Sequence, residues 1–163
     1  MQTIAKPAVR GRHRRAEERP RHIEDGEFRA RALDRIARDR LARIAERRDV
    51  AELSAAGKSQ REIAEVLSTT QPRVGRIVKV IELLGDPFEE TPEEMVMRAH
   101  VDGEDRGVLV KRLSAISYTG SEYAPYPSEG KAAGTWDQVR QAYFSGFLSE
   151  DEFDRIKSAA HVG

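Results

Sequence analysis

Two short helix-forming segments, separated by a very short turn, constrain the fold of this chain more than any other sequence feature. The sequence SQRE at residues 59–62 is a capping box, which predicts that a helix begins there. Thr70, with Pro72 in the first turn behind it, predicts a second helix start, and Gly85 followed by Asp86-Pro87 predicts the end of that helix. Two helices joined by so tight a turn are typical of a helix-turn-helix.

The apolar residues of both segments fit that geometry. The small residue Ala64 stands where the two helices are expected to cross, and branched apolar side chains surround it at helical spacing. The predicted shared core comprises Ile63, Ala64, Leu67, Val74 and Ile77.

The same segments resemble known DNA-binding proteins. Residues 57–64 (GKSQREIA) resemble the first helix of many bacterial helix-turn-helix proteins, and residues 70–77 (TQPRVGRI) resemble their recognition helix. The similarity reaches resolvase-like and ParB/KorB-like domains of bacteria and phages and covers about 30 residues. Ser68 replaces the usual turn glycine and Thr69 the usual apolar residue after it. The resemblance implies that the helix Thr70–Leu84 lies in the major groove of DNA.

Candidate DNA contacts follow from that placement. Arg can bind guanine, Gln can bind adenine, and a proline ring can touch a thymine methyl group. The candidate base-reading residues are Gln71, Pro72, Arg73 and Arg76. The candidate phosphate-binding residues are Lys58, Ser59, Arg61, Thr70 and Lys79. The alternative is that Arg61, Arg76 and Lys79 are only solvated charges on a helix face.

The charge distribution supports a nucleic-acid surface in the first half. The chain of 163 residues has 28 basic and 28 acidic residues and no formal net charge. Residues 1–85 hold 20 Lys and Arg against 13 Asp and Glu, a net +7, and residues 86–163 hold 8 against 15, a net −7. Such asymmetry indicates a binding surface on one half. Arg outnumbers Lys, which suits bidentate phosphate contacts but also fits a GC-rich genome.

Three regions are expected. Residues 1–23 predict a disordered basic arm whose Arg10, Arg12, Arg14 and Arg15 contact DNA, the alternative being a merely soluble tail. Residues 24–85 predict a DNA-binding domain with a long helix before the helix-turn-helix. That helix ends at Gly57, and a break near Arg48 stays open.

Residues 86–163 predict an acidic domain of four short helices packed around aromatic side chains, so the predicted fold class is all-α. Capping boxes at Thr91–Glu94 and Ser149–Glu152 and a cap at Thr135 predict three of the helix starts, and the remaining helix is expected to begin at Glu104. The expected core comprises Trp136, Tyr143, Phe147 and Phe153. This half is loosely similar to modules of actinobacterial and phage regulators. We expect it to form a homodimer or bind a protein partner, with Tyr123 and Tyr126 as anchors. Stacking of single-stranded nucleic acid is the alternative, which its negative charge opposes.

No feature of the sequence indicates an enzyme, a cofactor or a metal site. The chain has no Cys, and its four His are scattered. Gly57-Lys58-Ser59 imitates a phosphate-binding loop, but a helix is predicted before it and Glu52 stands where that motif needs Gly. No apolar run is long enough to span a membrane, so we expect a cytoplasmic protein.

We therefore interpret the chain as a sequence-specific transcriptional regulator, a repressor, acting on double-stranded DNA. Two alternatives keep the same DNA-binding half. In the first, residues 86–163 bind a toxin and the helix-turn-helix autoregulates an antitoxin operon. In the second, the protein is an adaptor of plasmid or phage partition and maintenance.

Overall fold

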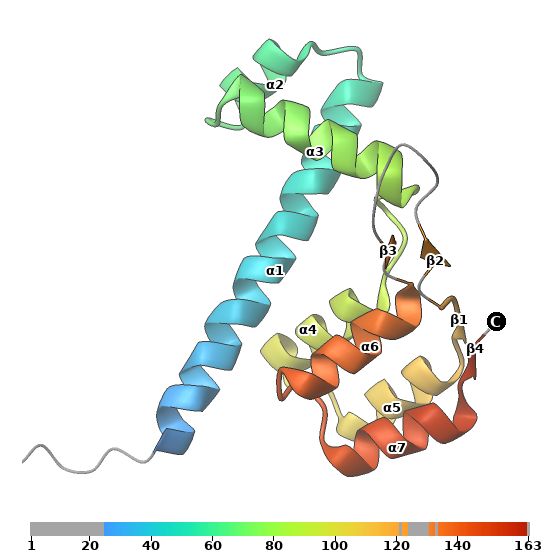
Figure 1. The fold of residues 1–163 in the computed structure, drawn as a ribbon. Coiled ribbons are helices and arrows are strands. Elements are labelled where there is room, and N and C mark those ends of the chain that lie inside the picture. The colour runs from blue at the N-terminus through green and yellow to red at the C-terminus, as the bar shows by residue number, and fades with distance from the viewer. Residues whose placement is uncertain (1–24, 121, 124–130, 133, 163) are drawn as a thin grey trace, which may run out of the picture.

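The protein is all-α, as its sequence predicts. The computed structural model describes residues 25–120, 122–123, 131–132 and 134–162, and this part contains seven helices (Figure 1). Its strands are two residues long. β1 (Ser117–Tyr118) pairs in parallel with β4 (His161–Val162), and β2 (Glu122–Tyr123) pairs antiparallel with β3 (Lys131–Ala132). Within those residues, no helix is both long and apolar enough to cross a bilayer.

A single long helix, α1, packs against both the helices that follow it and the C-terminal helices. It runs without interruption over Asp25–Ala55, 31 residues, so the break considered near Arg48 does not occur. Gly57 ends it in the left-handed conformation, with φ of 82°, as predicted. The amides of Gly57 and Lys58 donate to the carbonyls of Ser54 and Leu53, which satisfies acceptors that the helix end would otherwise leave free.

Two shorter helices follow at the C-terminal end of α1. α2 spans Gln60–Val66 and α3 spans Gln71–Leu84. The predicted capping box is present at the start of α2. The Glu62 amide donates to the Ser59 hydroxyl, and the Ser59 amide donates to the Glu62 carboxylate. Ser68, in the turn between the helices, has φ of 51°. Thr70 takes the N-cap position of α3 without a side-chain hydrogen bond.

The first of two cores lies where α1, α2 and α3 meet. Its fully buried members are Val50 of α1, Ile63 and Ala64 of α2, and Val74 of α3. Leu53, Leu67, Ile77, Val78 and Ile81 pack around them. All five residues of the predicted shared core therefore belong to it. No residue of α1 was predicted to belong to this core. Val50 of α1 is buried there because α2 and α3 present apolar faces to it.

Four helices follow: α4 (Pro92–Asp102), α5 (Arg106–Ser114), α6 (Thr135–Phe144) and α7 (Glu150–Ala159). Their core is separate from the first and includes Ala37 of α1 among its buried side chains. The ring of Tyr143 stacks on that of Phe153 with 4.5 Å between the ring centroids, and Trp136 also stacks on Phe153, at 5.8 Å. All four predicted aromatic side chains therefore belong to one core, with Phe147 buried and the other three partly buried.

Two helix starts differ in detail from their prediction. The Thr91 hydroxyl accepts from the Glu94 amide, but the Glu94 carboxylate binds arginines instead of closing a capping box. Thr135 is the first residue of α6 and not its cap, because the Asp137 carboxylate accepts from the amide of Gly134. The cap at Ser149 and Glu152 forms as predicted.

α1 contributes to both cores, through Ala37 to one and Val50 to the other. A partly buried ion cluster around the buried Glu94 carboxylate also joins α1 to α4. Arg48 donates two hydrogen bonds to Glu94, at 2.8 and 2.7 Å, and Arg98 donates two more at 2.9 and 2.7 Å. Arg48 also donates to the Pro87 carbonyl in the connecting segment. The predicted boundary between the two regions, at residue 85, therefore lies just before residues that Arg48 binds directly to α1.

Candidate nucleic-acid interface

One face of α3 points away from the rest of the molecule. Its opposite face carries Val74, Ile77, Val78 and Ile81 into the first core. Pro72, Arg76, Lys79 and Leu83 are spaced by three or four residues, share the outward face, and are all exposed. This outward stripe contains no acidic residue. Two of the four predicted base-reading residues, Pro72 and Arg76, lie on it, together with the predicted phosphate ligand Lys79.

The other two predicted base-reading residues lie off this stripe. Gln71 is exposed in the first turn of α3. Arg73 is turned toward α1, where its guanidinium donates two hydrogen bonds to the Glu46 carboxylate, both of 2.7 Å. These hydrogen bonds hold the pKa of Glu46 below its ordinary value and raise that of Arg73. With Nε and Nη2 engaged, Arg73 has only Nη1 free for another acceptor while this pair is closed.

The start of α2 lies along one flank of α3. A Cβ atom on Gly75 would come 3.2 Å from the amide oxygen of Gln60, so glycine permits the close approach of the two helices here. The predicted phosphate ligands Lys58, Ser59 and Arg61 are exposed on this side. The Ser59 hydroxyl is engaged with Glu62 in the capping box, and Arg61 pairs with Glu65 at 3.3 Å.

The other flank of α3 forms an open groove with α1. Four arginines converge there, two of them from each helix. The groove is lined by Asp39, Ala42, Arg43, Glu46 and Arg47 of α1 and by Arg73, Arg76, Ile77 and Val80 of α3. Arg43 and Arg47 were absent from the predicted site, because in sequence they are two charges among many on a long helix. Their spacing of four residues, which places both on one helix face, was the available signal.

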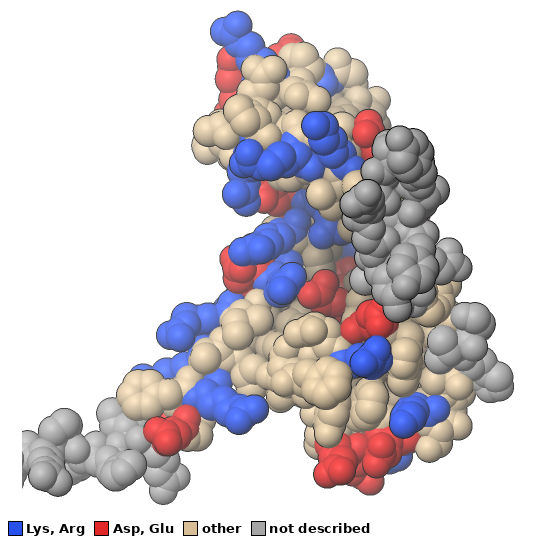
Figure 2. Space-filling view, in the orientation of Figure 1, with Lys and Arg blue, Asp and Glu red and all other residues tan. Residues whose placement is uncertain are grey.

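Lys and Arg side chains are most frequent along α1 and α3 on the face shown in Figure 2. Between these basic side chains single acidic ones are visible, and a cluster of acidic side chains lies over α7 (Figure 2). The gradient seen in the sequence is therefore also a separation in space. It leaves the face that carries the groove available to a polyanion.

Several predicted residues cannot be placed in this way. The arm arginines Arg10, Arg12, Arg14 and Arg15 lie outside the described residues, as does Tyr126. Tyr123 lies in β2, where only the backbone pairing is described. The expected roles of these residues stay predictions.

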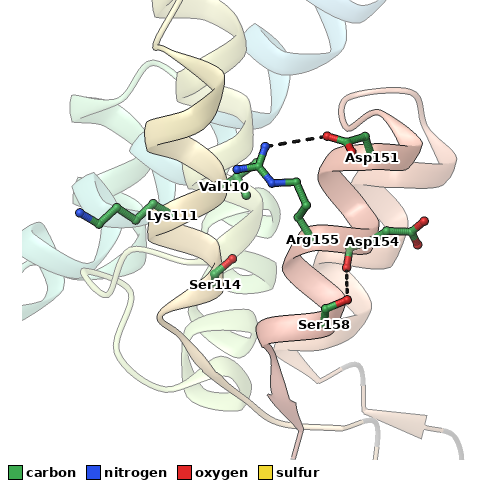
Figure 3. Close-up of a pocket in the computed structure, with 7 residues that line it drawn as sticks. All are labelled: Val110, Lys111, Ser114, Asp151, Asp154, Arg155 and Ser158. Carbon is green, nitrogen blue, oxygen red and sulfur yellow. Dashed lines mark hydrogen bonds and ion pairs between the residues drawn. The ribbon is translucent and has the colours of Figure 1, made fainter.

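A second depression lies between α5 and α7 (Figure 3). It is lined by Val110, Lys111, Ser114, Asp151, Asp154, Arg155 and Ser158. Arg155 pairs with Asp151 at 3.8 Å, Ser158 donates to the backbone carbonyl of Asp154, and Lys111 points away from Arg155. These groups satisfy one another and do not converge on a point where a reacting atom could sit. Nowhere in the described part of the chain do three or more His, Asp or Glu gather as a metal site would require.

The ion pair between Arg48 and the buried Glu94 is the other feature that sequence reasoning missed. Burial opposes the ionisation of Glu94, yet the hydrogen bonds from Arg48 and Arg98 hold its pKa below the ordinary value. It therefore stays charged, with a side chain only 2% exposed. Because its partner lies 46 residues away, no local sequence pattern predicts the contact.

No protein-family model, no curated protein and no solved structure matches this chain.

Proposed function

We propose that this chain is a sequence-specific DNA-binding transcriptional regulator in which α2 and α3 act as a helix-turn-helix. The observation that carries the proposal is the outward stripe of α3, which is basic, free of acids and backed by a buried apolar face. A helix with its side chains is about 10–12 Å wide and the major groove is about 12 Å wide, so α3 can enter it along this stripe. Occupation of an operator in this way is sufficient for repression.

The residues take distinct roles in this proposal. Arg76 reads a guanine, Gln71 reads an adenine from the first turn, and Pro72 contacts a thymine methyl group. Lys79, with Lys58 and Arg61 at the start of α2, holds phosphates and sets the register. Arg73 is a positioning residue, because its bidentate bond to Glu46 fixes α3 on α1.

Residues 86–163 have a second role in the proposal, as an oligomerisation or partner-binding module. Their acidic surface over α7 repels DNA and leaves the basic face as the one that docks. A homodimer would read two half-sites about one helical turn apart. The proposal requires neither a cofactor nor a catalytic reaction.

Selection of binding sites from random double-stranded DNA by the full chain tests the proposal. We expect one enriched motif, and an Arg76→Ala variant that binds it with about 1–3 kcal/mol less free energy and tolerates other bases at one position. Lys111→Ala, which removes an exposed charge of α5 beside the other depression, is the matched control and should bind like the original chain. Recovery of no motif would overturn sequence-specific recognition. Equal losses on motif and random DNA would remove base reading from Arg76.

A further inference from the structure

The two flanks of α3 are both basic, but only one of them was expected to hold phosphates. On the helix, positions 73 and 75 lie on opposite sides of the outward stripe. Gly75 approaches Gln60 of α2, whereas Arg73 bonds to Glu46 of α1. A helix that fills the major groove has a phosphate backbone along each flank. The backbone beside α2 would meet Lys58 and Arg61, and the other would meet the groove between α1 and α3.

The charges of this groove leave two guanidinium groups for a ligand. Asp39 accepts from Arg43 at 2.9 Å, and Glu46 accepts from Arg73 at 2.7 Å. Among the residues that the structure describes, Arg47 and Arg76 have no ion-pair partner, and both line the groove. The two carboxylates are thus neutralised in place. Because Arg76 is assigned to a base, Arg47 is the planar donor of the groove that remains for a phosphate, whose oxygens its guanidinium can bind in pairs.

The groove favours a phosphate that belongs to a chain over a small free anion. It is an open surface feature, so water would compete strongly for an isolated ion. It is also continuous with the outward stripe, because Arg76 belongs to both. When α3 docks in the major groove, a backbone phosphate of the same DNA comes to lie at the groove. Its binding there needs no further loss of translational entropy.

We infer that the groove between α1 and α3 is a second phosphate-binding surface, at which Arg47 holds the DNA strand opposite the one contacted by α2 while Arg76 beside it reads a base. This inference rests on the proposed function. It gives α1, which also belongs to both hydrophobic cores, a direct part in DNA binding. Arg43 lies one helical turn before Arg47 and also lines the groove, where it is paired with Asp39.

The test measures the affinity of the full chain for its selected duplex and for a random duplex at several salt concentrations, by fluorescence anisotropy. Each phosphate contact adds about 0.9 to the slope of log affinity against log salt. We expect Arg47→Ala to reduce that slope by about 1 and to weaken both duplexes by the same factor. Arg47→Lys should keep most of the slope because it keeps the charge, and circular dichroism shows whether each variant is folded.

Arg35→Ala is the matched control, because Arg35 is an exposed arginine of the same helix that does not line the groove. It should leave the slope unchanged. An unchanged slope in Arg47→Ala would overturn the inference, even if Arg76→Ala still abolished recognition of the motif. Equal slope losses in Arg47→Ala and Arg35→Ala would also overturn it, since they indicate a diffuse field and no site. Failure of the original chain to bind any duplex would refute the proposed function itself.

Discussion

The turn between α2 and α3 should become more stable when its serine is replaced by glycine. Ser68 has φ of 51°, in the left-handed region, and its amide donates to Glu65 while that of Thr69 donates to Ala64 at 2.9 Å. This geometry is required for α3 to cross α2 and reach the core through Val74. The conformation costs a residue with a side chain about 1–2 kcal/mol.

Ser68→Gly removes that cost but increases the entropy of the unfolded chain, by about 0.5–1 kcal/mol. Ser68 is exposed, and its hydroxyl makes no hydrogen bond with the described part of the chain, so the substitution removes little else. The net expectation is a gain of about 0.5–1 kcal/mol in the free energy of unfolding. Urea denaturation followed by far-UV circular dichroism measures it.

The matched control is Ser54→Gly. Ser54 is also exposed, but it lies in the last turn of α1 with helical geometry, so glycine should destabilise the protein by about 0.5 kcal/mol. Opposite signs at the two positions would support the reasoning. A loss of stability in Ser68→Gly equal to that in Ser54→Gly would refute it, because the turn would then not be held in the left-handed conformation.

Two further predictions concern ion pairs. Two hydrogen bonds from Arg106, at 2.6 and 2.8 Å, together with those from Ser149 outweigh burial and lower the pKa of Glu152 from 4.5 to about 2. The charged pair should therefore stabilise the folded chain above pH 4.5 and lose this contribution as the pH falls toward 2. Glu152→Gln should cost about 3 kcal/mol near neutral pH and progressively less in acid, measured by urea unfolding across pH, and a cost independent of pH would contradict it. For the half-exposed pair of Arg73 and Glu46, a double-mutant cycle of Arg73→Ala and Glu46→Ala should give a coupling of about 0.5–1 kcal/mol in stability. Strictly additive losses would show that Arg73 does not position α3.

Much of the local structure could be predicted because its signals are local. Helix caps act within one turn, so the sequence SQRE located the start of α2 and Gly57 located the end of α1. The prediction was wrong at Thr91 only in the partner of Glu94, whose carboxylate is taken by Arg48 from a distant helix. At Thr135 it was wrong by one residue, because the Asp137 side chain can serve the preceding glycine.

In the candidate site, too, the features set by local spacing could be predicted and those set by contacts between helices could not. Spacing of three and four residues is sufficient to separate the outward stripe of α3 from its buried face, so Pro72, Arg76 and Lys79 could be named in advance. Which of the remaining arginines are free depends on contacts between helices. Arg73 and Arg76 are both exposed arginines of α3, yet only Arg73 pairs with Glu46.

By itself, the sequence determined the all-α fold, the tight turn between α2 and α3 and the separation of charge between the two halves. These follow from caps, periodicity and composition, which do not depend on distant residues. Only the tertiary structure decided that α1 belongs to both cores, that Glu94 is buried with Arg48, and that Arg43 and Arg47 face α3 across a groove. The physical reason is that a long amphipathic helix offers many faces of similar polarity, and its partners, packed against it, select among them.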